Sequence, residues 1–239
     1  TNALSNKGWA LNNLERYNEA ITWYDKALEV DPNHLITLND KGLALDNLGK
    51  HNEAIVWLDK ALDIEPNYTN ALSNKGWALN NLERYNEAIT WYDKALGVDP
   101  THLSALTGKG LALDNLGKHN EAITWYDKAL EVDPIDLSAL NNKGVALNDL
   151  GKHNEALFWV DKALEVDHMD QYVLDEKGRT LVELGKHNEA ITWYDKALGV
   201  DPTHLSALTG KGLALDNLGK HNEAITWYDK ALETYYKTK

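Results

Sequence analysis

Apolar residues recur along the chain at the three- and four-residue intervals that mark one face of an α-helix. In the first 34 residues one such stripe runs from Ala3 to Leu14, and a second runs from Ala20 to Leu28. A short polar segment at residues 15–17 separates the two stripes. The pattern therefore predicts two helices joined by a tight turn.

This helical hairpin recurs every 34 residues. The glycine of the first stripe stands at seven positions 34 residues apart: Gly8, Gly42, Gly76, Gly110, Gly144, Gly178 and Gly212. Some copies are literal, because residues 1–28 reappear at 69–96 and residues 86–130 reappear at 188–232. We expect one continuous array over residues 1–239, with repeats at 1–34, 35–68, 69–102, 103–136, 137–170, 171–204 and 205–239.

Three invariant small residues have a packing explanation. Gly8, Ala20 and Ala27 fall where two helices must approach closely, so a larger residue at Gly8 should overpack the contact at a cost of roughly 1–3 kcal/mol. One hairpin is too small to bury its own apolar stripes. Each repeat should therefore gain its stability by stacking on its neighbours.

Polar residues predict where the second helix of each hairpin begins and ends. Asn18 stands where a side-chain cap is wanted at the start of the helix. Asp31 precedes Pro32, which disfavours further helix. At the fifth boundary Asp167-His168 replaces Asp-Pro, so we expect that boundary to be looser or more continuously helical.

The residues Gly8, Ala20, Tyr24, Ala27 and Pro32, at these spacings, resemble the signature of the tetratricopeptide repeat, and the 34-residue period is that family's. The resemblance covers the whole chain. It implies an all-α fold, a right-handed superhelical solenoid of seven helix-turn-helix repeats. In that family the first helices line a concave groove in which peptides or protein segments bind.

Two columns depart from the family pattern. Lys7 and its equivalents occupy a place that is often apolar, and we expect their alkyl stems to lie along the helix contact while the ammonium reaches water. Trp23 has an equivalent in every repeat, so we interpret this tryptophan column as structural.

If the first helices line a groove, its surface should carry a ladder of amides and carboxylates. The positions of this ladder are Asn12, Asn13, Asp46, Asn47, Asn80, Asn81, Asp114, Asn115, Asn148, Asp149, Val182, Glu183, Asp216 and Asn217. An amide offers both a donor and an acceptor, so the ladder could hold the backbone of an extended peptide. The alternative is that these residues only solvate a helix surface. Trp9 and Trp77 are candidate anchors, although a tryptophan at helical spacing is more often packed against its neighbours.

The sixth repeat departs from the others on the same face. There Tyr172, Asp175, Arg179 and Glu183 replace the Asn, Ser and Leu of other repeats. A contact selected for binding and drift in one repeat explain this difference equally well. The added carboxylates favour a basic partner whose binding weakens as salt rises.

Composition narrows the classes of function. The net charge of −13 argues against a nucleic-acid partner, and no apolar run is long enough to predict a membrane span. The absence of cysteine fits a reducing compartment, so we expect a cytoplasmic protein. No phosphate-binding loop or catalytic triad is recognisable, and five histidines (His51, His119, His153, His187 and His221) recur in the turns between helices. We expect no enzymatic activity, no cofactor and no metal.

The sequence thus predicts a scaffold that binds a protein or peptide segment, extended and neutral to basic, in its groove. Two alternatives stay open. One is a structural element that self-associates by head-to-tail stacking of uncapped terminal repeats. The other is the targeting arm of a larger enzyme.

Overall fold

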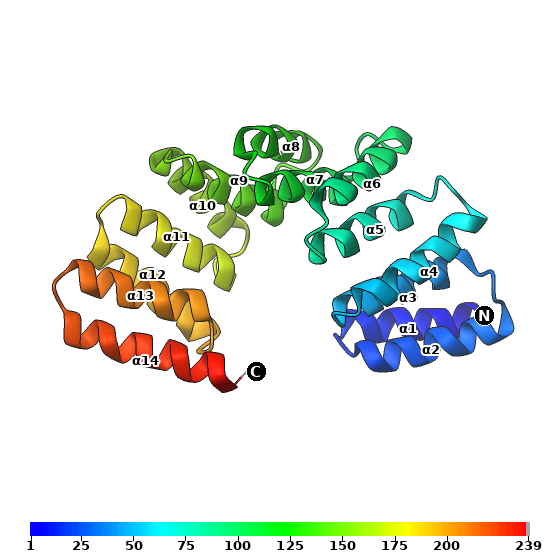
Figure 1. Cartoon of the computed structure of the whole chain (residues 1–239), viewed down its shortest axis with the longest axis horizontal. Helices are drawn as coiled ribbons and strands as arrows, with labels where there is room; N and C mark the ends of the chain where they lie inside the picture. Colours follow the sequence, from blue (N-terminus) through cyan, green and yellow to red (C-terminus); the bar gives the residue numbers. More distant parts are fainter. Residues whose placement is uncertain (238–239) are drawn as a thin grey trace. The chain divides into compact units, whose positions relative to one another are not determined.

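Over residues 1–237, which the computed structural model describes, every regular element is an α-helix (Figure 1). The fourteen helices are α1 (Asn2–Asn13), α2 (Tyr17–Val30), α3 (Leu35–Asn47), α4 (His51–Ile64), α5 (Thr69–Asn81), α6 (Tyr85–Val98), α7 (Leu103–Asn115), α8 (His119–Val132), α9 (Leu137–Asp149), α10 (His153–Val166), α11 (Gln171–Glu183), α12 (His187–Val200), α13 (Leu205–Asn217) and α14 (His221–Lys237). Each predicted repeat holds one pair of these helices, which confirms the all-α repeat fold. The last predicted repeat, 205–239, ends in Thr238 and Lys239, which lie outside the described residues.

The chain divides into two compact units, Thr1–Trp125 and Tyr126–Lys239. The first unit holds α1–α7 and the start of α8, and the second holds the rest of α8 and α9–α14. Within each unit the helices follow one another as antiparallel pairs (Figure 1). The single continuous array over residues 1–239 stays a prediction.

Each unit is built of two helix layers. An odd-numbered helix packs against the even-numbered helix that follows it and against the next odd-numbered helix, as α1 does with α2 and α3, and α11 with α12 and α13. Among α2, α4 and α6 of the first unit, and among α10, α12 and α14 of the second, no two helices pack together. The odd-numbered helices therefore form the more closely packed layer. The sequence prediction places the ladder on the face of this layer that points away from the even-numbered helices.

The invariant small residues allow close packing inside each hairpin, as predicted. A Cβ atom built at Gly8 would lie 2.5 Å from Cε1 of Tyr24, whose side chain is fully buried. The same ring position contacts the next repeat, because a Cβ at Gly108 would lie 2.5 Å from Cζ of Tyr92. Large side chains on the second helices thus fill the space that small residues on the first helices leave open.

The second helices begin two residues earlier than we predicted. Tyr17 is the first residue of α2 and Arg16 occupies the capping position, with no side-chain hydrogen bond to the helix. Asn18 lies inside the first turn, where its backbone carbonyl accepts a hydrogen bond from Thr22 Oγ1 at 3.0 Å. The prediction that Asn18 caps the helix is therefore wrong. The preceding turn, in which Glu15 has a φ of 58°, brings the chain back to helical geometry at Tyr17. Asn18 therefore lies inside the helix and cannot cap it.

The fifth boundary is as sharp as the others, which corrects the expectation of a looser or continuous helix. Asp167 ends α10 in an extended conformation, with φ −135° and ψ 102°, close to the φ −139° and ψ 93° of Asp31 before Pro32. The Asp167 carboxylate accepts a hydrogen bond from the Met169 backbone N–H at 2.9 Å. This Asx turn ends the helix without a proline.

The lysine column also differs from our expectation. The ammonium of Lys41 does not reach open water, because it pairs with Asp25 of the preceding repeat and lies 3.4 Å from the ring centroid of Trp57. Only 6% of Lys41 is exposed. Equivalent contacts join Lys75 to Asp59 and Trp91. The tryptophan column is thus part of a cation–π and ion-pair contact that connects successive repeats.

Candidate binding surface

The two columns of the predicted ladder have different surroundings. In the first column Asp46, Asn80 and Asn148 are buried, with exposed fractions of 6–7%. In the second column all the residues are exposed. These are Asn13, Asn47, Asn81 and Asn115 in the first unit and Asp149, Glu183 and Asn217 in the second unit. The second column is therefore the more accessible one, although Asn81 donates to Asp46 and Asp149 accepts from Arg179.

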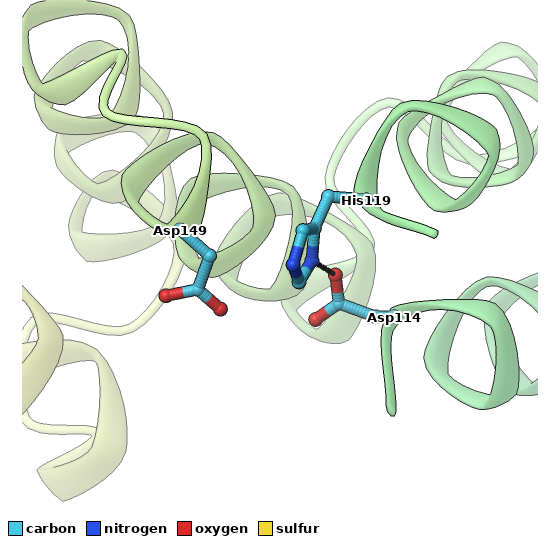
Figure 2. Close-up of side chains that lie close together, drawn as sticks. All are labelled: Asp114, His119 and Asp149. Carbon is cyan, nitrogen blue, oxygen red and sulfur yellow. Dashed lines mark hydrogen bonds and ion pairs between the residues drawn. The ribbon is translucent and has the colours of Figure 1, made fainter. Parts of the chain in front are cut away.

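Residues of the first column hold the turn that follows them. Asp46 accepts a hydrogen bond from His51 Nδ1 at 2.6 Å, and its other oxygen accepts from Asn81 Nδ2 at 3.0 Å. Figure 2 shows the equivalent contact in the fourth repeat, where His119 Nδ1 lies 2.7 Å from a carboxylate oxygen of Asp114. The equivalent contact, which stabilises the turn between two helices, is made by His51, His119, His153 and His221. Nδ1 of His187, in contrast, has no such partner within residues 1–237.

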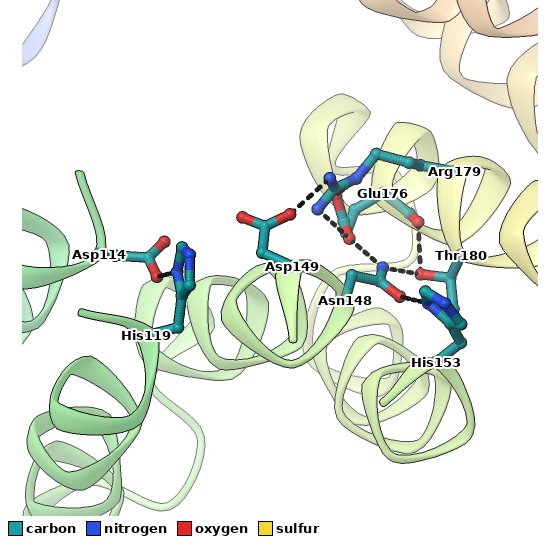
Figure 3. Close-up of polar contacts among 8 residues, drawn as sticks. All are labelled: Asp114, His119, Asn148, Asp149, His153, Glu176, Arg179 and Thr180. Carbon is teal, nitrogen blue, oxygen red and sulfur yellow. Dashed lines mark hydrogen bonds and ion pairs between the residues drawn. The ribbon is translucent and has the colours of Figure 1, made fainter. Parts of the chain in front are cut away.

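In the second unit Arg179, one of the predicted binding residues of the sixth repeat, is held by carboxylates of its own chain (Figure 3). Its Nε and Nη2 atoms donate to the two oxygens of Glu176 at 2.8 and 3.0 Å, and Nη1 donates to Asp149 at 3.0 Å. Burial acts to lower the pKa of Arg179, but the two carboxylates raise it overall. Arg179 is therefore a fixed cation that bridges α11 and α9.

The carboxylate of Glu176 is the buried centre of this network. Asn148 Nδ2 donates to Glu176 Oε1 and to Thr180 Oγ1, each at 2.5 Å, while Asn148 Oδ1 lies 3.0 Å from His153 Nδ1 (Figure 3). Burial raises the pKa of Glu176, against the lowering effect of Arg179 and Asn148. The polar departures of the sixth repeat thus bond largely with one another.

The other predicted residues of the sixth repeat differ in how accessible their side chains are. Asp175 is half-buried, and burial raises its pKa against the effect of a hydrogen bond with Ser206. Tyr172 is 62% exposed, with its ring edge-to-face on His204 at a centroid distance of 5.3 Å. Tyr172 and Glu183 are the two predicted residues of this repeat that remain accessible.

The two candidate tryptophan anchors are not equivalent. Trp77 is half-buried, and its indole N–H donates to Ser104 Oγ of the next repeat at 2.9 Å. Its ring also lies edge-to-face on Tyr92 at 6.2 Å. Trp9, in contrast, is 57% exposed. Trp9 is therefore accessible to a ligand, whereas Trp77 forms part of the contact between the third and fourth repeats.

Sequence reasoning missed the polar contacts between neighbouring first helices. Thr37 Oγ1 donates to Ser5 Oγ at 2.9 Å, and Asn74 Nδ2 donates to Asn39 Oδ1 at 2.9 Å. The partners in these pairs are 32 and 35 residues apart. The signal was present as polar residues recurring near the repeat length, but the period alone does not say which atoms meet.

None of the helices within residues 1–237 combines the length and the apolar content needed to cross a membrane.

Comparison with protein-family sequence models gives three matches along the chain. One tetratricopeptide repeat model matches residues 1–34, 69–102 and 104–136, and another matches residues 23–56 and 125–158. The model of subunit 3 of the anaphase-promoting complex, or cyclosome, matches residues 149–231. No curated protein sequence matches the chain.

Solved structures with a similar fold are numerous, and three illustrate the range. MamA is 25% identical, with a TM-score of 0.58, over 68% of this chain and 95% of MamA. A tetratricopeptide repeat protein from Parabacteroides merdae is 19% identical, with a TM-score of 0.75, over 98% of this chain and 92% of the other. YrrB, described as a tetratricopeptide repeat protein with an unusual peptide-binding site, is 24% identical, with a TM-score of 0.56, over 79% and 97%. With the helix pairs and their packing, these matches establish that the chain belongs to the tetratricopeptide repeat family, whose helical solenoids are protein-binding scaffolds.

Proposed function

We propose that this scaffold binds an extended, neutral-to-basic protein segment along the exposed amides of its first helices. The exposed column Asn13, Asn47, Asn81 and Asn115 carries the proposal, because it places one exposed amide on each first helix of the first unit, of which Asn81 also donates to Asp46. Each amide can donate to a backbone carbonyl and accept from a backbone N–H. Such a ladder holds an extended chain whatever its side chains are.

The spacing of the ladder suits an extended segment. Neighbouring packed helices lie roughly 8–10 Å apart, and an extended chain rises about 3.3 Å per residue. One asparagine would therefore meet the segment about once in every three residues. This regular spacing favours an extended segment over a helical one, which rises only about 1.5 Å per residue.

Charge supports the neutral-to-basic character of the segment. The chain carries a net charge of −13, and the exposed column of the second unit includes Asp149 and Glu183. An acidic segment would be repelled, while a basic one would be attracted and would associate more slowly and less tightly as salt rises. The same charge argues for a protein partner and against nucleic acid.

We propose no catalytic role for the chain. Members of this family are typically scaffolds, and recurring histidines are engaged by residues near the end of the preceding helix, as in His51–Asp46 and His153–Asn148. We also propose the cytoplasm as its compartment, from the absence of cysteine.

Self-association is a second candidate function. Ile225 and Leu232 of α14 are 55% and 53% exposed, whereas their equivalents Ile191 and Leu198 in α12 are half-buried against the core. A second copy could cover this apolar face by head-to-tail stacking. Sedimentation velocity over a hundredfold range of protein concentration tests this candidate, because a constant monomer would exclude it.

Selection from a random dodecapeptide library with the immobilised chain tests the first proposal. We expect enriched peptides to compete for one site and to bind more weakly as salt rises. The triple variant Asn13→Ala, Asn47→Ala, Asn115→Ala, which leaves the Asn81–Asp46 hydrogen bond intact, should weaken binding of an enriched peptide about tenfold or more, at about 1 kcal/mol per lost hydrogen bond.

The matched control is the triple variant Asn18→Ala, Asn52→Ala, Asn86→Ala, which removes three exposed asparagines from the second helices. Equal affinity of the two triple variants would place the site away from the ladder and refute the proposal.

A further inference from the structure

The chain contains one 28-residue segment in two settings. Residues 1–28 and residues 69–96 are identical, but the repeats that follow them differ. The first copy is followed by Ile36 in α3, and the second has Ser104 at the equivalent position of α7. Differences between Trp9 and Trp77 therefore arise from their surroundings and not from their own helices.

In the second copy the hydrogen-bonding capacity of the tryptophan is used. The Trp77 indole N–H donates to Ser104 Oγ at 2.9 Å, and Ser73 Oγ donates to the same hydroxyl at 3.2 Å. The neighbouring Asn70 is also engaged, since its Oδ1 lies 3.1 Å from His102 Nε2. This stretch of the surface is closed by contacts between the third and fourth repeats.

In the first copy the same groups are open. Ile36 has no side-chain acceptor, and among residues 1–237 the Trp9 indole N–H has no hydrogen-bond partner. Trp9 is 57% exposed and Ile36 is 53% exposed. Asn2 and Asn13 on the same helix are exposed as well. An unused donor and two large apolar side chains thus occur together beside exposed amides.

We propose that Trp9 and Ile36 form an anchor for one large aliphatic or aromatic side chain of the bound segment, while the Trp9 indole N–H donates to a backbone carbonyl of that segment. The inference rests on the proposed ladder. The ladder amides hold the backbone without regard to sequence, whereas the anchor adds a requirement at one position. An indole suits this role because it combines a large apolar face with one polar edge.

The environment favours this occupant over a charged one. Arg16, in the turn that follows α1, is held in an exposed ion pair by Glu19. Asp40, the nearest acidic position along α3, is half-buried, and its carboxylate accepts a hydrogen bond from Asn39 Nδ2 at 3.1 Å. Apolar contact and one neutral hydrogen bond are therefore what the Trp9–Ile36 pair can offer.

The test uses two synthetic ten-residue peptides of Gly, Ser and Lys that differ only at one central residue, Leu in one and Ser in the other. The full chain is labelled with 15N on its tryptophan indoles and asparagine amides, and the signal of Trp9 is assigned by its loss in Trp9→Phe. We expect the Leu peptide to shift the Trp9 signal and to bind about tenfold more tightly than the Ser peptide, as burial of a leucine side chain allows.

Two substitutions exchange the residues that stand at the equivalent positions of α3 and α7, after Trp9 and Trp77 respectively. Ile36→Ser should reduce the preference for Leu to less than about threefold, because it removes apolar surface and supplies the acceptor that Ser104 gives Trp77. Ser104→Ile should make the Trp77 signal respond to the Leu peptide and so create a second anchor. Both positions are on the exposed face, and thermal melting checks that each variant remains folded.

The outcomes separate the two proposals. Equal binding of both peptides, with shifts of Asn13 and Asn47 amides but none of Trp9, would overturn the anchor and leave the ladder standing. No shift of any signal at millimolar peptide would overturn both. A Trp9 signal that moves with protein concentration alone would assign this surface to a second copy of the chain and overturn the anchor.

Discussion

Arg179 and Glu176 form a two-point ion pair one turn apart on α11, with Nε–Oε2 at 2.8 Å and Nη2–Oε1 at 3.0 Å. The Glu176 side chain is 8% exposed, while that of Arg179 is 38% exposed. We expect Arg179→Ala to lower the free energy of unfolding by about 2 kcal/mol at pH 7, because it leaves a buried carboxylate without its cation. Amide hydrogen exchange in α11 measures the loss locally, which suits a repeat array.

The loss should depend on pH. Burial raises the pKa of Glu176 above its ordinary value of 4.5, so the folded state binds this proton at a higher pH than the unfolded state. Between the two values stability falls as pH rises. Arg179 lowers the Glu176 pKa, so its removal extends this window upward. The destabilisation should therefore shrink as the pH is lowered towards 4.5.

The control is the double variant Arg179→Ala, Glu176→Gln, which removes the titrating group and should abolish this pH dependence. A loss in Arg179→Ala that is the same at pH 5 and pH 8 would show that Glu176 is not its cause.

Gly76→Ala should overpack the contact between α5 and α6. The added Cβ would lie 2.5 Å from Cε1 of Tyr92, a fully buried ring with little room to move. We expect a loss of about 1–3 kcal/mol in the free energy of unfolding, measured by urea denaturation followed by circular dichroism.

Gly97→Ala is the matched control, because nothing lies within 4 Å of a Cβ built at that helical glycine. It should instead stabilise the chain by about 0.5–1 kcal/mol, through the better helix propensity of alanine. Equal effects at Gly76 and Gly97 would contradict the packing role of the invariant column.

Lys75 and Lys94 offer a comparison around one ring. Their ammonium groups lie 3.8 and 3.7 Å from the centroid of Trp91, but only Lys75 also pairs with Asp59 of the preceding repeat. The Lys75 side chain is 12% exposed, whereas Lys94 is exposed. We expect Lys75→Ala to cost about 1–2 kcal/mol and Lys94→Ala less than about 0.5 kcal/mol. Denaturation of both variants side by side tests whether this contact joins the repeats.

The sequence predicted the helix pairs and the reason for Gly8, because both depend on the spacing of apolar and small residues within one repeat. It did not predict the partners of Lys41 or Arg179. Those contacts join residues such as Lys41 and Asp25, 16 positions apart, or Arg179 and Asp149, 30 positions apart. A period shows which positions face a neighbouring repeat, but the partner of a long flexible side chain depends on local geometry.

The candidate surface was predictable to a similar extent. The sequence placed Asn12 and Asn13 together on one face, but a step of one residue turns a helix by about 100°. Asn13 consequently remains exposed, while Asn12 is half-buried with a buried Oδ1. Side-chain packing determines which of the two columns is accessible to a ligand and which is structural, and the sequence alone does not show this packing.

The turn before α6 contains a residue whose replacement should stabilise the chain. Glu83 has a φ of 59°, in the left-handed region that a side chain disfavours, and Glu15 has a φ of 58° at the equivalent position. The other repeats place glycine there, as in Gly117 with a φ of 73°. We expect Glu83→Gly to raise the free energy of unfolding by about 1 kcal/mol, because glycine adopts this conformation without steric cost. The reverse change, Gly117→Glu, should cost about as much, and both measurements in 1 M salt remove the effect of the altered charge. If Glu83→Gly instead destabilises the chain under these conditions, an interaction of the glutamate side chain outweighs the backbone strain at this turn.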